Sequence, residues 1–262
     1  MGAWGNRLSY SLTSLTNAVF GDILKAWRRE TFGHPGRPSS LADPPSAILH
    51  AFSSHVVPVP KDWPPHARVT GYWFLGTDAG WTPPADLASF LARGPAPLYV
   101  GFGSMTAMDA QAKTAIVLDA IRASGQRALL SRGWGALEAL DLPEGVMMID
   151  QVPHEWLFPR VSAVVHHGGA GTTAAGLRAG RPTVVCPFFG DQPFWGHRLH
   201  VLGAAPQVLP QKQLTARRLA EAIVTATTDP LMRERAAALG ALIRSEDGIA
   251  SAVEILETCG HR

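Results

Sequence analysis

The chain has 262 residues, a formal net charge of +2 and 46% hydrophobic residues. This length suits one large domain or two modest ones with a buried core, and so small a net charge argues against a nucleic-acid-binding protein. The sequence shows no basic leader with an apolar core, no apolar run long enough to span a membrane, and only two cysteines, Cys186 and Cys259. We therefore expect a cytoplasmic globular protein without a disulfide or zinc framework.

The first part of the chain contains one strong pattern. Apolar residues recur every three or four positions from Leu8 to Trp27, which predicts an amphipathic helix. Its apolar face either packs on a sheet or stays open to a lipid-like acceptor. Short strands are expected at 47–53 and 69–75, and glycine and prolines at 76–84 indicate a linker.

From Leu98 onward, short apolar runs alternate with helical patterns. The expected strands are 98–102, 127–130, 146–149, 162–166, 182–187 and 207–209. The expected helices are 86–92, 109–123, 136–140, 155–158, 172–179, 193–202, 214–225, 231–244 and 250–256. This alternation predicts a parallel, doubly wound α/β sheet, in which a ligand binds beyond the carboxyl ends of the strands.

The end of the expected strand 162–166 carries the most informative residues. The sequence there is HHGGAGTT, from His166 to Thr173. Glycines let the backbone approach an anion, and a helix N-terminus offers unpaired N–H groups and partial positive charge. The pattern therefore predicts a phosphate-binding turn. His167 either contacts a diphosphate or bonds to the backbone of the turn.

Other strand ends carry residues with a structural and a functional interpretation. Ser104 either donates to a phosphate or caps a helix, and Trp134 either stacks on a base or packs on a loop. Asp191 and Gln192 can hold adjacent sugar hydroxyls, cap the next helix, or do both. Residues 169–174 also fit the G-x-G-x-x-A pattern, so an NAD-binding oxidoreductase domain is an alternative.

The stretch HHGGAGTT…GLRAGRPTVVCPFFGDQPFW resembles the nucleotide-sugar-dependent glycosyltransferases of the GT-B fold (family 1). It is most similar to the sterol and lipid glucosyltransferase branch and to bacterial enzymes that glycosylate natural products. The motifs GFGSM at 101–105 and DQVPHEWLF at 150–158 extend the resemblance. The resemblance implies a UDP-glycosyltransferase with a Rossmann-like donor domain, a UDP-sugar as co-substrate, no cofactor and no metal.

The resemblance also implies a role for each matching residue. The implied diphosphate-binding residues are Ser104, His167, Gly169, Gly171, Thr172 and Thr173. The implied nucleoside-binding residues are Ser131, Trp134, Gln151 and Val152, and the implied sugar-binding residues are Asp191 and Gln192. Plant members have a tryptophan where Gln151 stands and a glutamate where Ala175 stands. Other groups must therefore hold the base and the ribose here.

The resemblance implies a domain boundary near Pro84. Residues 1–84 match the last part of an acceptor domain and its linker, and 85–262 match the donor-binding domain, whose last helix is expected to pack back on the N-terminal part. The family's catalytic histidine lies in an earlier loop without a counterpart here, so the general base is unknown. We therefore expect a truncated or excised piece, or the donor half of a split enzyme.

The sequence thus predicts the donor-binding part of a hexosyltransferase. The implied reaction transfers a hexose, expected to be glucose, from a UDP-sugar to a hydroxyl of a sterol, lipid or natural product, with inversion. A hydrophobic hydroxyl-bearing acceptor, a peripheral membrane contact and a partner chain with the acceptor half are the expected partners. A non-catalytic nucleotide-sugar-binding half is the alternative, and UDP and TDP are not distinguished.

Overall fold

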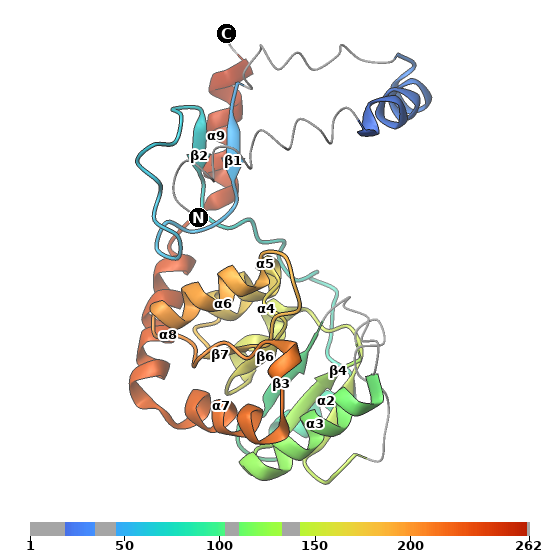
Figure 1. Ribbon diagram of the computed structural model, residues 1–262, viewed down its shortest axis with the longest axis vertical. Helices are drawn as coiled ribbons and strands as arrows, with labels where there is room; N and C mark the ends of the chain where they lie inside the picture. The colour runs from blue at the N-terminus through green and yellow to red at the C-terminus, as the bar shows by residue number, and fades with distance from the viewer. Residues whose placement is uncertain (1–18, 35–45, 103–109, 133–141, 261–262) are drawn as a thin grey trace. The chain divides into compact units, whose positions relative to one another are not determined.

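The computed structural model describes residues 19–34, 46–102, 110–132 and 142–260. They fall into two compact units, Met1–Ser46 and Ala47–Arg262, which are described separately (Figure 1). The first unit has a helix over 19–32, which confirms the second half of the predicted amphipathic helix. On its apolar face Val19, Ile23 and Trp27 are exposed. The predicted boundary near Pro84 stays a prediction.

The second unit is organised around a parallel sheet of five strands in the order β5-β4-β3-β6-β7. The strands are β3 (Leu98–Gly101), β4 (Ala128–Ser131), β5 (Val146–Ile149), β6 (Val164–His166) and β7 (Thr183–Val185). This order confirms the predicted doubly wound α/β sheet. The sixth predicted strand, 207–209, is wrong. Leu209 donates to the Val185 oxygen at 3.0 Å, but Pro206 and Pro210 have no N–H with which to extend a ladder.

Helices connect the strands and cover both faces of the sheet. They are α2 (Ala85–Ala92), α3 (Ala110–Ser124), α4 (His154–Leu157), α5 (Ala170–Arg178), α6 (Gln192–Val201), α7 (Ala216–Thr228), α8 (Pro230–Arg244) and α9 (Gly248–Gly260), with 3₁₀ turns η1 (Phe158–Arg160) and η2 (Gln211–Gln213). The predicted helix 136–140 lies outside the described residues. None of the helices in the described ranges is long and apolar enough to cross a membrane.

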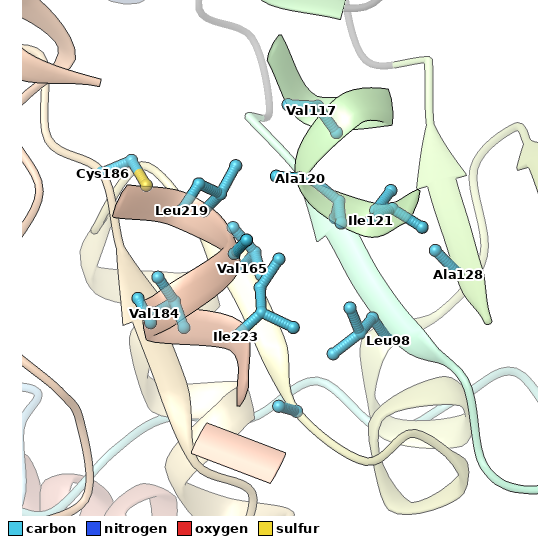
Figure 2. Packing of buried hydrophobic residues seen from close by; sticks show 14 of the residues in the cluster. Leu98, Val117, Ala120, Ile121, Ala128, Val165, Val184, Cys186, Leu219 and Ile223 are labelled. Atoms are coloured by element: carbon cyan, nitrogen blue, oxygen red, sulfur yellow. The ribbon is translucent and has the colours of Figure 1, made fainter. Parts of the chain in front are cut away.

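The core explains why the helices lie on both faces. Successive strand residues point to opposite faces, so Leu98 packs with Ile121 of α3 and Ile223 of α7 (Figure 2). On the other face, Tyr99 joins a cluster with Leu87 of α2. Cys186, just after β7, is fully buried in the first cluster, and burial raises the pKa of its thiol to about 12.

A smaller parallel pair precedes the main sheet. It consists of β1 (Ile48–His50) and β2 (Ala67–Val69). The predicted strand over 69–75 is wrong, because the chain leaves the extended conformation at Gly71, whose φ is +92°. A Cβ on Gly248 would lie 2.4 Å from the backbone oxygen of Tyr72, so the backbone after β2 packs directly on the first residue of α9.

Candidate functional site

The strand order places a ligand crevice between β3 and β6. From β3 the sheet continues to β4 and β5, and from β6 it continues to β7, so the order reverses between them. Gly101 at the end of β3 pairs with His166 at the end of β6. In open α/β sheets, ligands bind outside the carboxyl ends of the strands at such a switch point. The predicted phosphate turn begins here.

Gly168 determines the shape of this turn. Its φ is +92°, a conformation that favours glycine. A Cβ at this position would lie 2.7 Å from Val185 Cγ1 and 2.9 Å from the backbone oxygen of Gln192. The Gly168 N–H donates to Nδ1 of the buried His166 at 2.9 Å. The turn is therefore held by the core on both sides.

The turn leads into an open helix N-terminus. Gly169 is the N-cap residue of α5 and provides no side-chain cap. The Thr173 N–H donates to the Gly169 oxygen at 2.9 Å, so the three preceding N–H groups come before the helical ladder. A Cβ on Gly171 would meet no atom within 4 Å. This open end with partial positive charge can accept an anion.

The two histidines of the turn have different surroundings. His166 is fully buried, and burial lowers its pKa to about 3. His167 is half-buried; burial lowers its pKa, and the charge of Asp191 acts in the opposite direction. Among the described residues, neither His166 Nε2 nor His167 Nδ1 has a hydrogen-bond partner, and the two rings differ in their exposure. His166 therefore fixes the turn, and His167 is the histidine suited to bind a ligand.

The Asp191-Gln192 pair lies where α6 begins. Asp191 is the N-cap residue of α6, and its Oδ2 accepts from Trp195 Nε1 at 2.8 Å. Gln192 is buried, and its Oε1 accepts from the N–H groups of Phe188 at 2.8 Å and Phe189 at 3.3 Å. The side-chain Oε1 of Gln192 thus shapes the preceding loop, whereas the Asp191 carboxylate is exposed to solvent.

A cavity of about 660 Å³ lies beside the N-terminus of α5. It brings together four of the predicted residues: Ser131, Gln151, Val152 and Thr172. Ser104 and Trp134 lie outside the described residues. Thr173 is fully buried, and its hydroxyl has no hydrogen-bond partner in the described part of the chain.

The cavity also contains residues for which the sequence predicted no individual role. Trp81 comes from the 76–84 segment and meets Trp156 edge to face, with ring centroids 5.0 Å apart. Tyr99 from β3 places its hydroxyl 3.4 Å from His154 Nε2. Burial raises the pKa of Tyr99 and lowers that of His154 to about 4. His154 belongs to the DQVPHEWLF motif, so the motif was the signal for it, whereas Trp81 has no such signal.

Within the described ranges, no group of three His, Cys, Asp or Glu side chains could hold a metal ion.

Comparisons with known proteins extend these observations. Residues 134–258 match the family model described as Erythromycin biosynthesis protein CIII-like, C-terminal domain. The chain is 44% identical over 212 residues to Sterol 3-beta-glucosyltransferase UGT80A2 of Arabidopsis thaliana, with 80% of this chain and 33% of that protein covered. It is 38% identical over 271 residues to the Sterol 3-beta-glucosyltransferase of Aspergillus clavatus, with 98% of this chain and 19% of that protein covered. The chain thus spans about a third or less of these relatives.

Solved structures show the same architecture. The glycotransferase of kitacinnamycin gives a TM-score of 0.72 at 24% identity, covering 98% of this chain and 66% of that chain. Arabidopsis thaliana UGT89C1 complexed with UDP gives a TM-score of 0.59 at 19% identity, covering 75% of this chain and 52% of that chain.

The fold and its strand order therefore place the chain in the GT-B class of α/β proteins. Within that class, residues 134–258 match the EryCIII-like C-terminal domain, and the chain is similar to a part of the sterol 3-beta-glucosyltransferases. The resemblance inferred from the sequence is confirmed.

Proposed function

We propose that this chain is the donor-binding part of a UDP-glycosyltransferase and that its cavity holds a UDP-sugar. The observation that carries the proposal is the open N-terminus of α5, with His167 at its mouth, beside a cavity of about 660 Å³ at the switch point. The names of the relatives, sterol 3-beta-glucosyltransferases, support glucose as the sugar and a sterol as an acceptor. A lipid or natural-product hydroxyl is the broader class.

The diphosphate would lie against the turn. His167 donates one N–H in its neutral form, and the backbone of Gly169 and Gly171 and the Thr172 hydroxyl surround the helix N-terminus. Thr173 is buried behind these residues and supports them. Ser104, which lies outside the described residues, is a further proposed phosphate ligand. Asp191, with the Gln192 amide behind it, would hold hydroxyls of the sugar.

The nucleoside would occupy the other end of the cavity, where Ser131, Gln151 and Val152 lie. Trp134, which lies outside the described residues, is a further proposed contact of the base. Trp81, which lines the cavity, and Trp156, which contacts Trp81, supply aromatic surface that suits a planar base.

In the reaction, an acceptor hydroxyl attacks the anomeric carbon from the face opposite the UDP. The new C–O bond forms as the bond to the diphosphate oxygen breaks, so the configuration inverts and UDP leaves with the electron pair. Negative charge develops on the diphosphate, and preorganised donors at that point lower the barrier. The hydroxyl proton passes to a general base outside the assigned residues, which we propose an acceptor half supplies. A hydrophobic acceptor, a peripheral membrane contact and a cytoplasmic location belong to the same proposal.

Calorimetric titration of the chain with UDP and UDP-glucose tests the proposal. The wild-type chain should bind both, and His167→Ala should weaken both by at least tenfold, because a hydrogen bond to a charged group is lost. His197→Ala, which changes an exposed histidine on α6, is the matched control and should bind as the wild type does. A wild-type chain that binds NAD but neither UDP nor UDP-glucose would support the oxidoreductase alternative and refute the proposal.

A further inference from the structure

Glu155 holds a carboxylate at the junction of two cavities. It lies on α4 and lines both the 660 Å³ cavity and a neighbouring cavity of about 680 Å³. Its side chain is only 23% exposed, and Oε1 forms an ion pair with Arg178 on α5. The Arg178 guanidinium also lies over the Phe74 ring, 4.4 Å from its centroid. The carboxylate is therefore fixed in position by a partner that is itself fixed.

The other carboxylates of the 660 Å³ cavity are held differently. Asp150 is 81% exposed and lies 3.4 Å from Arg132. Asp78 accepts from the Gly80 N–H at 2.8 Å in an exposed turn. Of these three acidic residues, Glu155 combines partial burial with a well-placed cationic partner. Of the three, Glu155 is therefore best positioned to recognise a group of the ligand.

The chemistry of a carboxylate limits which ligand groups it can recognise. An ionised carboxylate only accepts hydrogen bonds, and it has about four acceptor sites, so the pairing with Arg178 leaves capacity for a further donor. It repels a phosphate, and Arg178 offsets that repulsion by neutralising its charge. The donors that a nucleoside diphosphate offers between its base and its phosphates are the ribose hydroxyls.

The position of Glu155 agrees with this chemistry. It lines the same cavity as Val152, at the proposed nucleoside end, and Thr172, at the proposed diphosphate end. Ala175, one turn further along α5 than Thr172, lines the neighbouring cavity with it and carries no polar group. The ribose joins base and diphosphate, so it would pass Glu155.

We infer that Glu155 is a specificity-determining residue that accepts a hydrogen bond from the ribose 2′-hydroxyl, and that Arg178 positions it. This inference rests on the proposed function and deepens it, since it selects UDP over TDP, whose deoxyribose lacks the 2′-hydroxyl. A site that bonds a ligand hydroxyl discriminates against the analogue without it, because its polar group is then left unpaired.

The test is a calorimetric comparison of UDP, 2′-deoxy-UDP and TDP on the full chain. The wild type should bind UDP about tenfold more tightly than 2′-deoxy-UDP, the effect of one hydrogen bond to a charged acceptor. TDP differs from 2′-deoxy-UDP by a methyl group and should bind much as that nucleotide does. Glu155→Leu should bind UDP and 2′-deoxy-UDP equally.

The matched control is Asp150→Ala, which removes a carboxylate from the same cavity and should keep the tenfold ratio. Glu155→Gln, which keeps a neutral acceptor and the side-chain volume, should show a ratio of about threefold and serves if the leucine variant does not fold. Equal wild-type binding of UDP and 2′-deoxy-UDP would overturn the inference while leaving the proposed function intact. A Glu155→Leu variant that binds UDP and 2′-deoxy-UDP more weakly but keeps the tenfold ratio of their affinities would also overturn the inference. A wild-type chain that binds no UDP would refute the proposed function and this inference together.

Discussion

Two segments near the 660 Å³ cavity are held in different ways. The turn after β6, which we call the core wall, leads into α5, whose Thr172 lines the cavity, and Gly168 of this turn packs in the core against Val185 and Gln192. The segment 75–81, which we call the surface wall, lines the cavity and is held by surface contacts: the backbone N–H of Trp81 donates to the backbone oxygen of Asp78 at 3.0 Å, and the Trp81 ring meets Trp156. Substitutions in the core wall should therefore change stability, and substitutions in the surface wall should change ligand affinity with little change in stability.

The strongest test of this contrast is Gly168→Ala. The left-handed backbone and the contacts that a Cβ would make with Val185 and Gln192 should together lower the free energy of unfolding by about 3 kcal/mol. Urea denaturation measures the change.

Gly171→Ala is the matched control within the same turn. It has open space around its Cβ and a helical position, so stability should stay the same or rise by up to about 1 kcal/mol. If Gly168→Ala were as stable as the wild type, the core wall would not be rigid in the way the structure indicates.

Two buried histidines, one at the end of β6, where the core wall begins, and one on α4, should also make stability depend on pH. Burial lowers the pKa of His166 to about 3 and of His154 to about 4, from the ordinary 6.5. Below pH 6.5 the unfolded chain binds protons that the folded chain does not, so this contribution is complete above pH 6.5 and is lost as the pH falls toward the folded pKa values. Between pH 7 and pH 5 each histidine should cost about 2 kcal/mol of unfolding free energy.

The comparison that isolates one histidine is wild type against His154→Gln, both unfolded in urea at pH 7 and pH 5. The variant should lose about 2 kcal/mol less than the wild type over this interval, because Gln does not titrate. Identical losses would mean that His154 does not stay neutral in the folded chain.

The sequence predicted the core wall well and the surface wall poorly, for physical reasons. A buried parallel strand such as β6 leaves an apolar run, and the turn after it needs glycine at Gly168, so both are visible as a pattern. The 76–84 segment has no period, so nothing in the sequence indicated that Trp81 reaches the cavity. Glu155 looked like an ordinary helix residue until the fold placed Arg178 beside it. The strand predicted at 207–209 failed because apolar character does not supply missing N–H donors at flanking prolines.

The surface wall should affect binding through its aromatic surface. Trp81→Ala should weaken UDP binding about tenfold, the typical effect of removing an aromatic ring that stacks on a base, and should leave the melting temperature within a degree or two of the wild type. Trp81→Phe keeps an aromatic face and should lose at most about threefold. A Trp81→Ala variant with unchanged UDP affinity, measured by the same titration, would place the base elsewhere in the cavity.

The smallest expected effect tests where the two walls meet the ligand. Thr172 is half-buried in the first turn of α5 and lines the cavity. Thr172→Val keeps the shape but removes the hydroxyl, so UDP binding should weaken about fivefold, or about 1 kcal/mol, the worth of one ordinary hydrogen bond. Thr172→Ser keeps the hydroxyl and should bind within about twofold of the wild type. Uridine lacks the diphosphate, so its affinity should not differ among the three proteins. A Thr172→Val loss that appears equally for UDP and for uridine would show that the hydroxyl acts on the cavity as a whole and not on the phosphates.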